Sequence, residues 1–111
     1  MKYTKYPKLK NELKELAKEI KELKHKRDNW WNFKHEVADY QQNYVQSVFM
    51  YEAFRKAREF RHKHIAYCLL RGRSYEQIEQ PREGNAPDMI YVQMIMDEYE
   101  KPETKFRAIQ H

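Results

Sequence analysis

Residues 61–84 read RHKHIAYCLLRGRSYEQIEQPREG, and this stretch decides the fold that we expect for the chain. Its apolar residues follow helical spacing up to Gly72, a residue that readily adopts the left-handed conformation that ends helices. Ser74 can cap a second helix, with Gln77 completing a capping box, and Pro81 ends that helix after about two turns. The stretch therefore predicts two helices joined by a tight turn.

A third helix is expected over 86–100, because Pro87 suits a first helical turn and the apolar residues that follow it are helically spaced. Together with helices expected over 60–71 and 75–80, it would form a helix-turn-helix-like trihelical head at residues 59–101. Heads of this kind bind DNA. The order of the elements therefore makes nucleic acid a partner to consider.

An amphipathic helix is expected from Pro7 to about Lys26, with one narrow apolar seam on an otherwise charged rod. The chain can fold back at the turn-like dipeptide Asp28-Asn29. The seam consists of Leu9, Leu13, Leu16, Ile20 and Leu23. Antiparallel helices would pair apolar residues whose numbers sum to 56 or 57, namely Leu23–Phe33, Ile20–Val37, Leu16–Tyr40, Leu13–Tyr44 and Leu9–Val48.

These pairs predict an antiparallel helical hairpin over residues 7–58, with Trp30 or Trp31 near its tip. Its second helix would be long, because neither glycine nor proline interrupts residues 30–71. One helix of that length would span about 60 Å, at ~1.5 Å per residue. We therefore expect a bend or break near residues 54–60, with one continuous helix as the alternative. The leucine seam has a competing use as the interface of a parallel homodimer.

The length and composition fit one all-α domain spanning residues 1–111, with residues 102–111 as a loose tail. Hydrophobic residues make up 41% of the chain and charged residues 35%, and only two residues are glycine. The single cysteine, Cys68, cannot form an intramolecular disulfide and fits a reducing compartment. Because no apolar run approaches membrane-spanning length and no signal-peptide core follows Met1, we expect a cytoplasmic protein without membrane contact.

Charge is unevenly distributed along the chain, whose net charge is +5 with neutral histidines. Residues 55–73 contain seven basic residues and one acidic residue, whereas residues 74–111 contain four basic and eight acidic residues. The basic segment predicts salt-sensitive binding to a phosphate backbone, without reading of sequence. Alternatively, its cations are exposed to solvent and compensate the negative charge of the C-terminal third. The candidate nucleic-acid-binding residues are Arg55, Lys56, Arg58, Arg61, Lys63, Arg71 and Arg73.

The helix expected over 86–100 is unsuited to reading bases in a major groove, because it contains no lysine or arginine. Its acidic and aromatic residues indicate contact with a protein instead, as do the two tryptophans expected at the hairpin tip. The candidate interface residues are Trp30, Trp31, Asp88, Tyr91, Asp97 and Glu98.

Motifs for catalysis and metal binding are weak. His64 and Cys68 lie four residues apart, as two zinc ligands can, but no second pair completes the usual set of four. Cys68 is better explained as a small buried hydrophobic residue. The sequence contains no glycine-rich phosphate loop and no nucleophile elbow. We therefore expect a non-enzymatic protein with no metal and no cofactor.

Two segments carry a resemblance to a known group of proteins. The phrase RHKHIAYCLLRGRSYEQIE at residues 61–79, followed by PREGN, resembles a block in short uncharacterised proteins of tailed bacteriophages. The lysine-rich opening at residues 6–26 is similar to the amino termini of those proteins. The resemblance covers about half of the chain and carries no function. It implies a setting, which is a phage accessory protein in the cytoplasm of an infected bacterium.

Three hypotheses follow for the function. The first is a basic helical protein that binds nucleic acid, or a nucleic-acid-handling complex, through the surface at residues 55–73. The second is a protein-directed phage effector that inhibits a host polymerase or a defence nuclease through its acidic and aromatic surface. The third is a structural or assembly protein that dimerises through the leucine seam.

Overall fold

The computed structural model describes residues 6–81, 84 and 86–100, and the regular structure of these residues is entirely helical. The expected all-α class is confirmed, and the expected tail at residues 102–111 lies outside the described part. No helix among the described residues is both long and apolar enough to cross a bilayer. In chain order the elements, with η for a 3₁₀ helix, are α1 (Pro7–Asp28), α2 (Trp30–Phe33), η2 (Lys34–Glu36), η3 (Asp39–Tyr44), α3 (Val45–Leu70), η4 (Tyr75–Gln77) and α4 (Pro87–Glu100).

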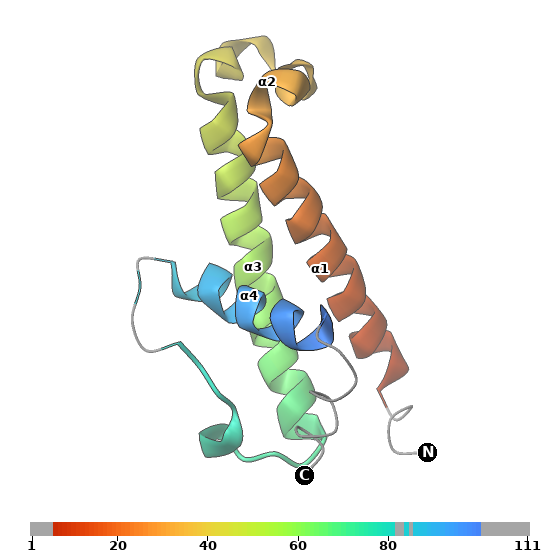
Figure 1. The fold of residues 1–111 in the computed structure, drawn as a ribbon. Helices are drawn as coiled ribbons and strands as arrows, with labels where there is room; N and C mark the ends of the chain where they lie inside the picture. The colour runs from red at the N-terminus through yellow and green to blue at the C-terminus, as the bar shows by residue number, and fades with distance from the viewer. Residues whose placement is uncertain (1–5, 82–83, 85, 101–111) are drawn as a thin grey trace.

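The two long helices, α1 and α3, lie side by side and antiparallel, and the short helices α2, η2 and η3 join them at one end (Figure 1). The second long helix therefore begins at Val45 rather than near residue 30, where the sequence predicted it. Extended backbone at Val37 and Ala38 interrupts the helical run. The Gln42 side chain stabilises the interruption, because its Nε2 donates to the carbonyl oxygens of Lys34 at 2.7 Å and Val37 at 3.1 Å. The break expected at residues 54–60 is wrong in position, since α3 is continuous there.

The register between α1 and α3 differs from the predicted one. Ion pairs connect Glu19 to Lys56 at 2.9 Å and Glu12 to Lys63 at 2.7 Å, and both pairs of numbers sum to 75 rather than 56 or 57. The predicted apolar pairs are therefore wrong. The connection between the helices shifts the register, and α3 buries a different stripe of residues. This stripe consists of Val45, Phe49, Ala53, Ala57, Phe60, His64, Tyr67 and Cys68.

The core lies where α4 crosses the α1–α3 pair (Figure 1). Its buried side chains come from all three helices and include fully buried Ala57, whose small side chain lets a neighbouring helix approach closely. The leucine seam is used inside the chain, so a homodimer through it would have to expose this core. The buried residues of the cluster are Leu13, Leu16, Ile20, Ala57, Phe60, Tyr67, Val92 and Met96.

The end of α3 follows the prediction, whereas the next element does not. Gly72 has a φ of 91°, and the hydrogen bonds from Gly72 N to the Leu69 carbonyl and from Arg73 N to the Cys68 carbonyl form a Schellman motif. Ser74 N donates to Oε1 of Gln77 at 2.8 Å, as in the predicted capping box. However, one 3₁₀ turn stands in place of the helix expected over 75–80, so the trihelical head is not confirmed.

Candidate binding surfaces

The first helix places four lysines and four glutamates on opposite flanks of the apolar seam. At about 100° of turn per residue, the lysines Lys10, Lys14, Lys18 and Lys21 fall within an arc of roughly 80°, and so do the four glutamates on the opposite flank. The glutamates are Glu12, Glu15, Glu19 and Glu22. These charges were expected to form one solvated surface, but the lysine spacing of four, four and three residues places the lysines on a single face.

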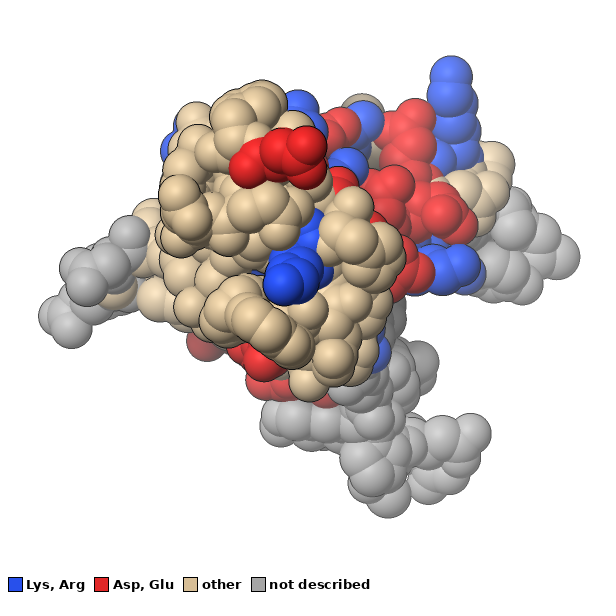
Figure 2. Space-filling model, turned by 90° about the horizontal axis from the view of Figure 1, so that it is seen from above, with Lys and Arg blue, Asp and Glu red and all other residues tan. Residues whose placement is uncertain are grey.

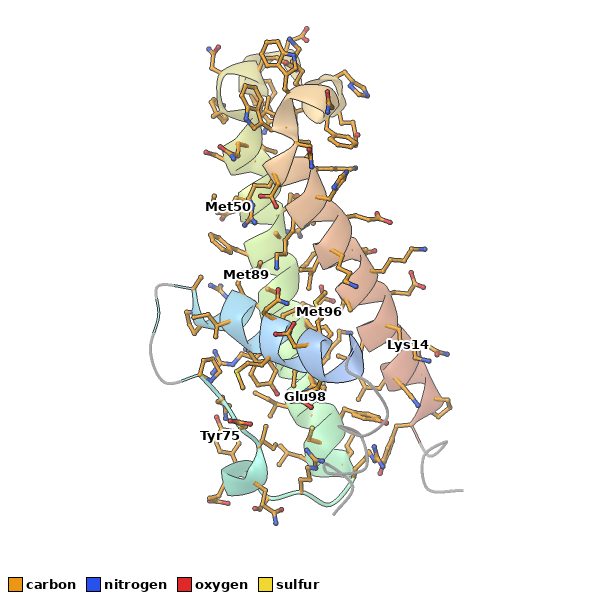
Figure 3. The ribbon with its side chains drawn as sticks, in the orientation of Figure 1. Lys14, Met50, Tyr75, Met89, Met96 and Glu98 are labelled. Atoms are coloured by element: carbon orange, nitrogen blue, oxygen red, sulfur yellow. The ribbon has the colours of Figure 1, made fainter. Side chains whose placement is uncertain are left out.

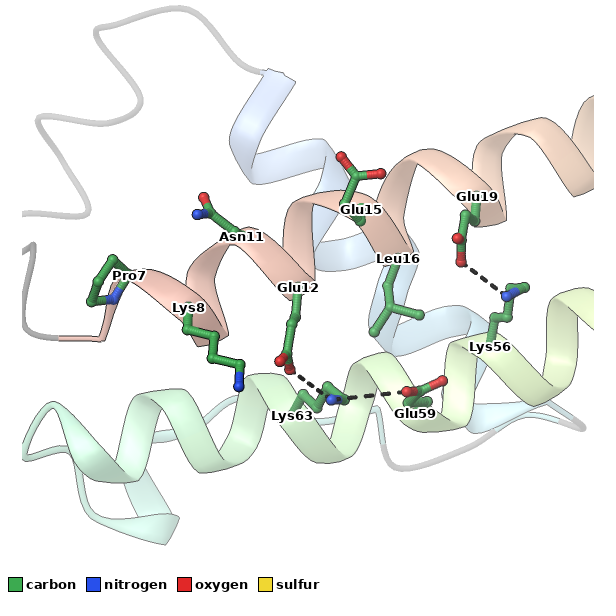
Figure 4. Close-up of a pocket in the computed structure, with 10 residues that line it drawn as sticks. All are labelled: Pro7, Lys8, Asn11, Glu12, Glu15, Leu16, Glu19, Lys56, Glu59 and Lys63. Carbon is green, nitrogen blue, oxygen red and sulfur yellow. Dashed lines mark hydrogen bonds and ion pairs between the residues drawn. The ribbon is translucent and has the colours of Figure 1, made fainter.

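Two glutamates of this flank, Glu12 and Glu19, face α3 and form ion pairs with it, whereas Glu15 and Glu22 are exposed (Figure 4). Lys63 pairs with Glu12 and lies 3.9 Å from Glu59, while Lys56 pairs with Glu19. The hydrogen bond from Lys63 lowers the pKa of the Glu12 carboxyl, and the same bond raises the pKa of Lys63. Two residues of the predicted nucleic-acid surface thus hold α3 against α1.

The other five predicted nucleic-acid-binding residues point in several directions rather than forming one face. Both Arg58 and Arg61 pair with Asp88 of α4, at 3.4 and 3.3 Å, and Arg61 also donates to Gln80 at 2.7 Å. Arg55 pairs with Glu52 within α3. At the far end of the helix, Arg71 lies over the Tyr67 ring and Arg73 lines a small cavity beside Cys68. Arg58 and Arg61 thus pair with an acidic residue of α4, in agreement with the alternative that the basic segment compensates the acidic C-terminal third.

The lysine flank is the contrasting surface, and we name Lys10, Lys14, Lys18 and Lys21 the lysine face. Lys14, Lys18 and Lys21 are exposed, and Lys10 is half-buried. The side chains of Lys10, Lys14 and Lys18 make no ion pair or hydrogen bond with another residue that the structure describes. Their charge is therefore available to an external anion.

The predicted interface residues of α4 fall into different environments. Tyr91 is fully buried, so its assignment to a protein interface is wrong; helical spacing placed it on the inner face of α4. Asp88 is engaged by the two arginines of α3. Asp97 is exposed and accepts a hydrogen bond from Gln93 at 2.7 Å, and Glu98 is half-buried. These acidic residues do not form one exposed cluster.

Aromatic side chains lie exposed at the end of the molecule where α1 and α3 are joined, the end near which Trp30 or Trp31 was predicted. The exposed fractions are 64% for Trp31, 76% for Tyr40 and 49% for Tyr44, and we name these three residues the aromatic tip. Trp30 is half-buried and packs edge-on against Trp31. Figure 2 looks down on this end and shows a largely uncharged surface with few charged side chains. A surface of this composition is typical of protein contacts.

A polar group lies inside the core between α3 and α4. Nδ1 of His64 is 2.8 Å from the Tyr91 hydroxyl, and Sγ of Cys68 lies 3.9 Å from the imidazole. Burial lowers the pKa of His64 to about 4, with a smaller contribution from Arg73, and burial raises the pKa values of Tyr91 and Cys68. The three groups are therefore uncharged near neutral pH. Cys68 is a buried small residue, as predicted.

Comparisons of the sequence with protein-family models and with curated proteins, and of the structure with solved structures, gave no match. The function is therefore inferred from the two surfaces themselves.

Proposed function

We propose that the protein is a non-enzymatic binding protein that holds nucleic acid by its phosphate backbone, through the lysine face of α1. The observation that carries this proposal is the separation of charge on α1. Glu12 and Glu19 are paired with lysines of α3, while Lys10, Lys14 and Lys18 have no counter-charge among the described residues. The sequence prediction of a nucleic-acid partner is retained, and the contact is moved from residues 55–73 to α1.

The chemistry of the face favours phosphate over bases. Lysine contacts a phosphate as a point charge, whereas base reading usually depends on the bidentate geometry of arginine, asparagine or glutamine. The four lysines extend along α1 for roughly 16 Å, at ~1.5 Å per residue. That length allows contact with several successive phosphates. We expect binding to duplex DNA or RNA with little dependence on sequence and a strong dependence on salt.

Matched charge-removal variants test the proposal. The triple variant Lys10→Gln, Lys14→Gln, Lys18→Gln removes the unpaired lysines, and Arg55→Gln, Arg58→Gln, Arg71→Gln removes three exposed cations of the sequence-predicted surface. Both reduce the net charge by three. Titration of labelled duplex DNA at low salt should show loss of affinity in the first variant and near wild-type affinity in the second. Equal losses of affinity in the two variants would indicate an effect of net charge alone. A larger loss in the arginine variant than in the lysine variant would assign the contact to residues 55–73.

The aromatic tip favours a second candidate function, which is the protein-directed effector. Residues 29–51 contain only three charged residues, and one of them, Glu36, is paired with Lys26. An uncharged aromatic surface suits a protein partner better than a phosphate backbone. Capture of a partner from nuclease-treated bacterial lysate should fail with Trp31→Ser, Tyr40→Ser and persist with Tyr51→Ser, which removes an exposed aromatic residue of α3 outside the tip. Both candidate functions are compatible with the expected setting of a phage accessory protein.

A further inference from the structure

A groove lies between α1 and α4, on the same flank of α1 as the lysine face. Its volume is about 420 Å³, and it is lined by residues of α1, by Phe60 of α3 and by Met96 of α4. Figure 3 labels Lys14 and Met96, which border the groove from α1 and from α4. The lining consists of four lysines and four apolar residues, namely Lys10, Lys14, Lys18, Lys21, Leu13, Ala17, Phe60 and Met96.

The chemistry of this lining is divided between floor and rim. Leu13, Phe60 and Met96 belong to the buried core, so the bottom of the groove is apolar. Lysine carries its charge at the end of an apolar stem, so the rim can present positive charge above that floor. Among the residues that the structure describes, no acidic residue lines the groove. Its volume is within the range of sites for small ligands, which are mostly apolar with a few polar groups that fix orientation.

We propose that this groove binds a single-chain anionic amphiphile, with the alkyl chain on the apolar floor and the anionic head group against the lysines. Charge complementarity selects this occupant. A neutral amphiphile would leave Lys10, Lys14 and Lys18 without an anion, and a nucleic acid would leave the apolar floor uncovered. The last eleven residues of this chain carry three basic residues and one acidic residue, so charge complementarity does not select them as the occupant.

The proposal shares the lysine face with the proposed nucleic-acid contact but does not depend on it. The apolar floor takes no part in binding phosphates, so the two ligands can be separated by changes in the floor. Because both need the same lysines, they should compete for the protein.

Titration with palmitate below its aggregation concentration tests the proposal, with methyl palmitate as the neutral ligand of matched chain length. Palmitate should bind with one-to-one stoichiometry and at least about tenfold more tightly than the ester. Ala17→Phe fills the floor and should reduce palmitate affinity by about tenfold or more, while duplex DNA binding stays at the wild-type level. The double variant Lys14→Gln, Lys18→Gln should bind both palmitate and duplex DNA more weakly than the wild type. Circular dichroism establishes that each variant retains its helical content.

Three results would overturn the proposal. They are absence of palmitate binding, equal affinity for the ester, and unchanged palmitate affinity in both Ala17→Phe and a second floor variant, Met96→Gln. An acidic amphipathic peptide serves as a further ligand in the same titration. Binding of that peptide without binding of palmitate would assign the groove to a protein partner and reject the amphiphile. Loss of DNA binding alone would reject only the nucleic-acid function.

Discussion

The imidazole of His64 and the hydroxyl of Tyr91 form a 2.8 Å hydrogen bond that connects α3 to α4 inside the core. Tyr91 is fully buried, and His64 is 8% exposed. The phenol ring of Tyr91 also packs edge-on against the imidazole, and the guanidinium of Arg61 lies over the Tyr91 ring, 5.6 Å from its centroid. This polar pair fixes the position of α4 across the hairpin.

The stability of the protein should fall in mildly acidic solution because of His64. Its pKa is about 4 in the folded protein and 6.5 in an ordinary environment, so the unfolded chain binds the proton more readily. The contribution to stability is complete above about pH 6.5 and is lost as the pH falls towards 4, on the order of 3 kcal/mol in total. Urea unfolding at a series of pH values measures it. The variant His64→Gln should lose most of this dependence, and an unchanged curve would contradict the assignment.

Removal of the Tyr91 hydroxyl should destabilise the protein without affecting its binding surfaces. Tyr91→Phe leaves Nδ1 of His64 without its partner in the core, which costs about 1–3 kcal/mol. Urea unfolding should show that loss, and DNA affinity should be unchanged. If Tyr91→Phe instead lost DNA affinity while keeping its full stability, Tyr91 would belong to a binding interface.

The register of the hairpin can be tested by zero-length cross-linking. A carbodiimide joins a carboxylate to an amine that touches it, so Glu19 and Lys56, whose charged atoms are 2.9 Å apart, should be linked within one chain. Peptide mass spectrometry identifies the link. The sequence-predicted register would bring Lys18 close to Asp39 instead. A dominant link between those two residues, with none between Glu19 and Lys56, would contradict the structure.

Gly72 should resist substitution because its φ of 91° lies in the left-handed region. Gly72→Ala should lower the free energy of unfolding by about 1–2 kcal/mol. The neighbouring exposed residue Arg71 has a φ of −87°, so Arg71→Ala should change stability by less than about 0.5 kcal/mol. Equal effects in urea unfolding would show that the Schellman motif contributes little.

Local signals in the sequence predicted the start of α1, the end of α3 and the start of α4. Pro7, Gly72 and Pro87 lie where the predictions placed them, because each restricts the backbone through its own chemistry. The class of fold follows from such signals together with helical periodicity. The start of α3 could not be predicted from such signals, because the interruption at residues 37–38 contains neither glycine nor proline. It is stabilised by the Gln42 side chain. The arithmetic of apolar pairs assumed a tight turn and therefore gave the wrong register.

The candidate site was harder to predict than the fold. A count of charges favours residues 55–73, but it does not show which cations are paired in three dimensions. Asp88 is distant in sequence from Arg58 and Arg61, and Glu12 is distant from Lys63. The lysine face was accessible to sequence analysis through its helical spacing, once lysines and glutamates were placed on separate flanks. That Lys56 pairs with Glu19 and Lys63 with Glu12 could be seen only from the structure.

The dependence of duplex DNA binding on salt tests the central claim most directly. The logarithm of the association constant should fall linearly with the logarithm of salt concentration, with a slope of about −0.9 for each phosphate neutralised. If the lysine face makes the contact, Lys14→Gln should reduce the magnitude of the slope by about 0.9, and Arg55→Gln should leave it unchanged. A slope that Arg55→Gln alters and Lys14→Gln does not would contradict the assignment of nucleic-acid binding to α1.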